Sequence, residues 1–167
     1  MEGLVNSSFW ENKKVLVTGN TGFKGSWLSL WLQKLKAEVI GFALKPCTNP
    51  SMFEVAKVSQ GMTSIEGDIR NFDHIASVVK EYKPEIIFHL AAQPLVLRSY
   101  RYPLETYSTN VMGTAHLFES VRLSESVRVI INVTSDKCYE NRESNSGYRE
   151  IDPLGGFDPY SSSKGCS

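Results

Sequence analysis

The chain has 167 residues, and its 18 basic and 18 acidic side chains balance to a formal net charge of zero. A chain of this length suits one domain with a substantial core, and the balanced charge argues against nucleic acid or an anionic membrane as a partner. The start lacks the basic and apolar regions of a secretory signal, and no stretch reaches the roughly 18 apolar residues of a membrane span, so we expect a cytoplasmic protein.

Short β-rich runs alternate with helix-length segments along the chain, which is the pattern of βαβ units. The expected strands cover residues 14–18, 38–42, 63–66, 85–90 and 127–133, and the expected helices cover residues 23–35, 52–56, 72–82 and 104–123. The last two strands are nearly continuous apolar runs, which is typical of strands covered on both faces of a parallel sheet. We therefore predict an α/β fold, a Rossmann-like doubly wound parallel sheet of at least five strands with helices on both faces.

The stretch VTGNTGFKG, residues 17–25, places Gly19, Gly22 and Gly25 three residues apart, after the first strand and before the first helix. At this turn of a doubly wound sheet the helix N-terminus offers unpaired N–H groups to an anion, and glycine lets the backbone approach closely. Spaced glycines alone can mark a purely structural turn. Their place within a chain of βαβ units favours a pyrophosphate-binding turn, and so a dinucleotide.

The end of the second strand lacks the acidic residue that usually holds the ribose 2′-hydroxyl of NAD. Ala43 stands there, and Lys45 follows two positions later, where its charge can attract a 2′-phosphate. The sequence therefore predicts weak discrimination between NAD and NADP.

Tyr160 and Lys164 in YSSSK are four residues apart, which places them on one face of a helix. A phenol is a poor base at neutral pH, but a close cation stabilises its phenolate, which can then take a hydroxyl proton while hydride leaves for NAD. The spacing alone also occurs by chance in many helices. Ser135 follows the fifth strand, at the edge where open α/β sheets bind ligands, and its hydroxyl can bond the same substrate oxygen.

Six stretches together resemble the extended short-chain dehydrogenase/reductase family: TGNTGFKG, GDIRN, HLAAQPLVLRSY, TNVMGT, VTSDKCYEN and YSSSK. They are most similar to its sugar-nucleotide dehydratases, in particular those that act on CDP-glucose. The resemblance implies an NAD-dependent 4,6-dehydratase (a hydro-lyase) with a nucleotide-sugar substrate, a homo-oligomer at full length and a role in lipopolysaccharide O-antigen biosynthesis. NADP stays open as the cofactor.

The resemblance also implies the site residues. It makes Ser135, Tyr160 and Lys164 the catalytic trio, and it puts Asp68 and Ile69 beside the adenine, although GD is also an ordinary turn and helix cap. The implied cofactor-binding residues are Gly19, Thr21, Gly22, Phe23, Lys24, Gly25, Asp68, Ile69, Leu90, Ala91, Ala92, Tyr160 and Lys164.

A 4,6-dehydratase needs an acid and a base beside the hydride site, because it removes the C5 proton and protonates the departing C6 hydroxyl. Related dTDP-glucose enzymes carry an Asp-Glu pair, whereas this chain has Asp136 and Lys137. We expect Asp136 to be the acid and Lys137 the base, if burial or a nearby cation favours neutral lysine. Two alternatives stay open. The two side chains are a solvated pair at a loop mouth, or the protein is a 4-epimerase, which needs only the Ser, Tyr and Lys groups.

Family members are roughly twice as long. The resemblance therefore implies that residues 1–167 are an incomplete NAD(P)-binding Rossmann domain, truncated after the Tyr-x-x-x-Lys motif and lacking the substrate domain. Such a chain is expected to be inactive alone, and a non-catalytic dinucleotide-binding fragment is a further alternative. Because the chain stops three residues after Lys164, we expect its last helix to have little to pack against and to fray.

The three cysteines form no CxxC pair and their number is odd, so we expect free thiols. His89 lies in a predicted buried strand and is expected to be a hydrogen-bonded core histidine. His74 and His116 lie on predicted helices without neighbours that suggest a metal site, and no metal is predicted.

Overall fold

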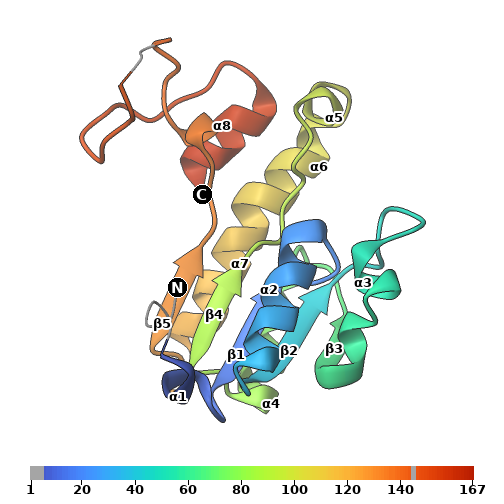
Figure 1. The fold of residues 1–167 in the computed structure, drawn as a ribbon. Coiled ribbons are helices and arrows are strands. Elements are labelled where there is room, and N and C mark those ends of the chain that lie inside the picture. Colours follow the sequence, from blue (N-terminus) through green and yellow to red (C-terminus); the bar gives the residue numbers. More distant parts are fainter. Residues whose placement is uncertain (1–5, 144–145) are drawn as a thin grey trace.

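A computed structural model describes residues 6–143 and 146–167. Its centre is one sheet of five parallel strands in the order β3-β2-β1-β4-β5. The strands are β1 (Lys14–Thr18), β2 (Glu38–Ala43), β3 (Thr63–Glu66), β4 (Ile86–His89) and β5 (Val129–Asn132). The chain runs outward from β1 to β3 and then crosses back to β4, so the switch point lies between the carboxyl ends of β1 and β4 (Figure 1). The predicted doubly wound sheet is confirmed.

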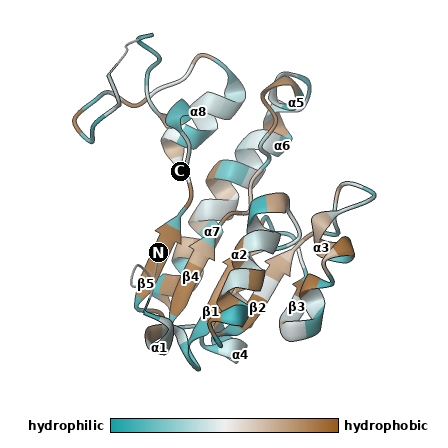
Figure 2. Ribbon diagram, in the orientation of Figure 1, coloured by the Kyte–Doolittle hydropathy of each residue, from teal (hydrophilic) through white to brown (hydrophobic). Residues whose placement is uncertain are grey.

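Helices cover both faces of this sheet (Figure 1). The three longest are α2 (Phe23–Lys34), α4 (Phe72–Tyr82) and α7 (Gly113–Arg122). Side chains alternate along β1, so Val15 and Val17 join Leu32 of α2 in one core, and Leu16 joins Leu117 of α7 in the other. Figure 2 shows hydrophobic residues concentrated in the strands between these layers. No helix among the described residues is long and apolar enough to cross a membrane.

Most predicted elements agree with the structure within one or two residues. β3 and α4 have the predicted bounds, and β5 begins two residues later than predicted. The predicted short helix at residues 52–56 is present as α3 (Met52–Val55). Two short segments that were not predicted also occur: α1 (Ser7–Trp10) and the 3-10 turn η1 (Val58–Gly61). The start of α4 is fixed by a side-chain cap: Asn71 accepts a hydrogen bond from the N–H of His74.

β5 is an edge strand of the described sheet, and one of its faces is exposed. Val129 and Ile131 are 48% and 37% exposed, whereas Ile130 packs against the core on the α4 and α7 side. The prediction that β5 is covered on both faces is therefore wrong for this chain. The cause is that α2 packs against β1 and β2 and does not reach as far as β5.

The residues predicted as one long helix form three segments: α6 (Pro103–Tyr107), the π-helical turn η2 (Ser108–Met112) and α7. The wider π turn carries Asn110, which is 1% exposed. A helical period in the sequence does not reveal one added residue in a turn. A further helix, α5 (Val96–Arg101), precedes α6 and was not predicted.

The last helix, α8 (Pro159–Cys166), lies beyond the carboxyl ends of the strands (Figure 1). It packs against α5, α6, η2 and the short 3-10 turn η3 (Asp136–Cys138). Tyr160 and Lys164 are only 9% and 7% exposed, and Asp158 caps the helix by accepting the N–H of Ser161 at 2.9 Å. The expectation that this helix has little to pack against is therefore wrong, because earlier elements of the same chain provide the surface.

Candidate active site

The glycine turn between β1 and α2 is so tight that two of its glycines have no room for a side chain. Gly19 has a φ of 74°, and a Cβ there would lie 2.9 Å from the backbone nitrogen of Ala91. A Cβ on Gly25 would lie 2.1 Å from the carbonyl oxygen of Gly19. These two glycines therefore bring the turn, the end of β4 and the first turn of α2 together.

Gly22 is required for a different reason. It is the N-cap of α2, and the nearest atom to a Cβ built on it is the Gly19 carbonyl oxygen at 3.4 Å, which is ordinary contact. No side chain caps α2, so the N–H groups of its first turn are left to a ligand. The open space beside Gly22 and the positive end of the helix dipole fit the pyrophosphate of a dinucleotide. Phe23 and Lys24, both predicted cofactor residues, lie exposed on this first turn.

The segment after β4 lies beside the glycine turn and contains the predicted cofactor residues Leu90, Ala91 and Ala92, which are all half-buried. The hydroxyl oxygen of Thr18, at the end of β1, accepts the N–H groups of Leu90 and Ala91, each at 3.2 Å. The two strand ends that flank the switch point are thus joined by side-chain hydrogen bonds as well as by the sheet.

His89 continues this network into the core. Its Nδ1 lies 2.7 Å from the Thr18 hydroxyl and its Nε2 lies 3.1 Å from the Thr114 hydroxyl. The Thr114 hydroxyl donates to the Asn110 carbonyl at 2.6 Å, so it accepts from His89 Nε2–H, and Nδ1 accepts from Thr18. Burial, with a further contribution from the charge of Lys164, lowers the pKa of His89 to about 4. The prediction of a hydrogen-bonded core histidine is confirmed.

Asn110 joins the β4 segment to the helix of the predicted catalytic residues, and the residue-by-residue reading of the sequence missed it. Its Oδ1 accepts the N–H of Gln93 at 2.8 Å, and its Nδ2 donates to the Ser163 hydroxyl of α8, also at 2.8 Å. Ser163 in turn donates to the carbonyl of Tyr160. The only feature of the sequence that could have indicated Asn110 is its place in TNVMGT, one of the stretches that resemble the family.

Ser135, Asp136 and Lys137 lie just beyond β5, where the sequence placed them. Ser135 caps η3 by accepting the N–H of Lys137 at 3.1 Å, and its hydroxyl proton stays available to a ligand. Asp136 and Lys137 are exposed. The burial that would favour a neutral Lys137 is therefore not supplied by the described residues.

Tyr160 and Lys164 are brought to the same edge of the sheet by α8, which packs against η3. The Lys164 ammonium donates to the carbonyl of Val133 at 3.4 Å, a long hydrogen bond. Burial lowers the pKa of Lys164, against an opposing effect of the nearby Cys138 thiol. The Tyr160 hydroxyl makes no hydrogen bond within residues 6–143 and 146–167, so it is free to meet a substrate oxygen.

Asp68 and Ile69, the predicted adenine neighbours, follow β3. The Asp68 carboxylate accepts the Arg70 backbone N–H at 2.9 Å, and a hydrogen bond from the Arg70 guanidinium keeps the pKa of Asp68 below its usual value. The cap of α4 is Asn71, so the helix-cap alternative for Asp68 is wrong, whereas the turn alternative agrees with its bond to Arg70. Ile69 is 4% exposed and belongs to the core, so only its backbone is available to a ligand.

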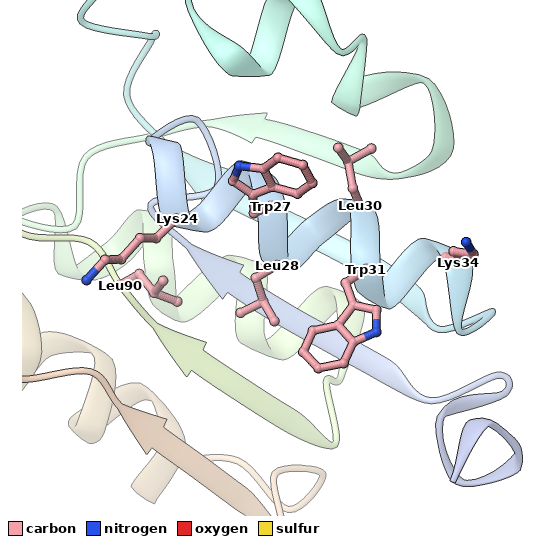
Figure 3. Close-up of a pocket in the computed structure, with 7 residues that line it drawn as sticks. All are labelled: Lys24, Trp27, Leu28, Leu30, Trp31, Lys34 and Leu90. Atoms are coloured by element: carbon pink, nitrogen blue, oxygen red, sulfur yellow. The ribbon is translucent and has the colours of Figure 1, made fainter. Parts of the chain in front are cut away.

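An apolar groove of about 550 Å³ runs along the outer side of α2. Figure 3 shows Lys24 and Leu90 at one end, with Leu28 and Trp31 further along. Trp31 is 53% exposed. The groove walls are almost entirely apolar and lack the N–H donors of the glycine turn. We therefore assign the anion site to the turn, although the groove reaches two of the predicted cofactor residues.

Metal-binding side chains do not gather in the described part of the chain. No group of three or more His, Cys, Asp or Glu residues is placed there to hold an ion. The cysteines, all three of which are described, are free, and two of them are exposed.

Residues 16–167 match the family model described as GDP-mannose 4,6 dehydratase. The chain belongs to this family. It is 56% identical to CDP-glucose 4,6-dehydratase of Salmonella typhimurium over 164 residues, which is 98% of this chain and 46% of that protein. It is 32% identical to UDP-glucose 4-epimerase of Mycolicibacterium smegmatis over 154 residues, 90% of this chain and 48% of that protein.

Solved structures agree with this membership. The crystal structure of dTDP-glucose 4,6-dehydratase from Bacillus anthracis in complex with NAD superposes with a TM-score of 0.75 at 28% identity, over 92% of this chain and 47% of that one. UDP-glucose 4-epimerase of Thermus thermophilus, also in complex with NAD, gives 0.76 at 26% identity, over 90% and 47%. The chain therefore spans about half the length of the relatives it matches.

Proposed function

We propose that this chain is the cofactor-binding half of an NAD-dependent sugar-nucleotide 4,6-dehydratase that acts on CDP-glucose. The observation that carries the proposal is that α8, the helix of Tyr160 and Lys164, packs against η3 at the carboxyl edge of the sheet. The η3 turn contains Asp136 and is capped by Ser135. The similarity to the Salmonella enzyme over nearly the whole chain supports CDP-glucose as the substrate. We also propose that the full-length protein is a cytoplasmic homo-oligomer with a role in O-antigen biosynthesis.

The residues at this edge fit the cofactor. The uncapped N-terminus of α2 and the space beside Gly22 receive the pyrophosphate, and the segment of Leu90 and Ala91 flanks the rest of the dinucleotide. NAD bound there would supply an acceptor for the hydride of C4 and, once reduced, a hydride donor for C6 of the sugar.

The side chains of η3 and α8 then divide the proton transfers. Tyr160 takes the proton of the C4 hydroxyl, and the buried ammonium of Lys164 stabilises the phenolate. Ser135 donates a hydrogen bond to the C4 oxygen and keeps its proton. Asp136 protonates the departing C6 hydroxyl, and Lys137 removes the C5 proton once the C4 ketone has acidified it. For Lys137 this role requires cover that the described residues do not supply.

A 4-epimerase is the second candidate, and the exposure of Asp136 and Lys137 favours it. An epimerase needs only Ser135, Tyr160 and Lys164, and it leaves the C6 oxygen in place. A dinucleotide-binding fragment without turnover is the third, because the chain spans only half of its relatives.

The experiment joins this chain to the second half of the Salmonella relative and supplies CDP-glucose. We expect a 4-keto-6-deoxy product from the hybrid. Asp136→Asn should slow elimination by a hundredfold to ten-thousandfold, on the scale of general acid catalysis, so that the absorbance of reduced nicotinamide rises and decays slowly. Tyr160→Phe should abolish that rise, because oxidation at C4 has lost its base. Normal turnover by Asp136→Asn would remove Asp136 from the mechanism and favour the epimerase.

A further inference from the structure

A small pocket of about 220 Å³, lined by both polar and apolar side chains, lies at the carboxyl ends of β2 and β3. Its walls include Thr21 of the glycine turn, Ala43 and Lys45 at the end of β2, and Ser64 and Glu66 of β3. The Thr21 hydroxyl donates to the carbonyl of Leu44 at 2.8 Å, which ties the glycine turn to the loop after β2. The pocket is thus continuous with the turn that we propose for the pyrophosphate.

Glu66 supplies a carboxylate to this pocket from the neighbouring strand. Glu66 pairs with Ala43, the residue at the end of β2 where the usual acid is missing. Because paired residues of neighbouring strands point to the same face of a sheet, the Glu66 carboxylate lies one strand away on the face of Ala43. The Glu66 carboxylate lies 3.7 Å from the Lys45 ammonium, and the two side chains are 63% and 79% exposed. The pocket therefore contains one negative and one positive charge, both accessible to a ligand.

A buried amide lies behind the same wall. Asn20 is fully buried, and its Oδ1 has no hydrogen-bond partner among the described residues. The Nδ2 of Asn20 donates to the Ser64 hydroxyl only at 3.5 Å. The Asn20 amide occupies the space that a side chain on Gly41 would fill. The hydroxyl of Ser64 is therefore weakly engaged by the protein and can serve a ligand in the pocket.

We propose that Glu66 binds the ribose 2′-hydroxyl of the dinucleotide in place of the acid missing from β2, and that Lys45 reduces the resulting preference for NAD. This inference rests on the proposed dinucleotide function. A carboxylate accepts from a 2′-hydroxyl and repels a 2′-phosphate, whereas the ammonium attracts that phosphate. With both charges present the two effects cancel only in part, and a preference for NAD of about tenfold is expected.

The test measures the dissociation constants of NAD and NADP by calorimetry for the 167-residue chain and three variants. Glu66→Gln should lower the ratio of the NADP constant to the NAD constant by about tenfold, because Lys45 then acts alone on a phosphate of charge near −2. Lys45→Gln should raise the ratio by a similar factor. The control is Glu11→Gln, which removes an exposed ion pair with Lys36 far from the pocket and should leave the ratio unchanged.

The results separate this inference from the proposed function. If wild type binds both dinucleotides and neither pocket variant moves the ratio by more than about twofold, Glu66 and Lys45 do not read the 2′-position, and only this inference is wrong. If wild type binds neither dinucleotide, the proposed function fails and this inference fails with it.

Discussion

His89 should make the stability of this chain depend on pH between about 4 and 6.5. Burial, and to a smaller extent the charge of Lys164, lower its pKa from 6.5 to about 4. In that window the unfolded chain takes up a proton that the folded chain does not bind, so the free energy of unfolding falls as the pH falls. The full span from 6.5 to about 4 corresponds to about 3 kcal/mol, at about 1.36 kcal/mol for each pH unit. Between pH 7 and pH 5 the loss is about 2 kcal/mol.

His89→Gln isolates this contribution. Glutamine retains one donor and one acceptor for the hydroxyls of Thr18 and Thr114, but it does not titrate. Urea unfolding at pH 7 and pH 5, followed by circular dichroism, measures the loss for each protein. Wild type should lose about 2 kcal/mol more than the variant, because every other titrating group is common to both.

Thr114→Val is the matched control. It removes one hydrogen-bond partner of His89 and should destabilise the chain by about 1 kcal/mol or more at both pH values. It leaves the histidine buried, so its loss between pH 7 and pH 5 should equal that of wild type. Equal losses for wild type and His89→Gln would refute the inference that the fold holds this histidine neutral.

Two further substitutions test the site residues. Gly22→Val should weaken NAD binding more than tenfold in calorimetry yet leave the chain folded, because within the described structure a Cβ there meets one atom, at 3.4 Å. Gly25→Val should unfold the chain, since its Cβ would overlap the Gly19 carbonyl. Undiminished NAD affinity of Gly22→Val would remove the basis of the phosphate site. Lys164→Met should raise the free energy of unfolding at pH 7 by about 1 kcal/mol, because it removes a buried charge with one long hydrogen bond. That gain should shrink as the pH rises toward 10.5, the ordinary pKa of lysine, because the lowered pKa lets the folded wild type release its buried charge before the unfolded chain does. A drop in stability at pH 7 would contradict this prediction.

The sequence predicted the sheet because apolar periodicity and glycine spacing are local signals. β3 and α4 have their predicted bounds for that reason. The exposed face of β5 was not predictable, because the apolar pattern of a strand is the same whether or not a helix covers it in this chain. The wrong expectation for α8 has a similar origin, since its packing depends on α5, α6 and η2, which are distant in sequence.

The candidate site likewise combines features that local motifs predicted with contacts between distant segments that they did not. The motifs located the glycine turn, Ser135 and the pair of Tyr160 and Lys164, which the structure brings to one edge of the sheet. They did not reveal that Asn110 links the β4 segment to α8, because that contact depends on a single π turn. Likewise, only strand register brings Glu66 beside Ala43, at the end of the strand where the sequence indicated a missing acid.

The most direct test of the dehydratase assignment follows one hydrogen atom. CDP-glucose labelled with deuterium at C4 is converted by the hybrid of this chain and the second half of the Salmonella relative, and the product is examined by mass spectrometry and NMR. A 4,6-dehydratase should give a 4-keto-6-deoxy sugar with the deuterium in its C6 methyl group and no net consumption of NAD. Deuterium retained at C4 of an epimerised sugar, with the C6 oxygen still present, would contradict the assignment and identify a 4-epimerase instead.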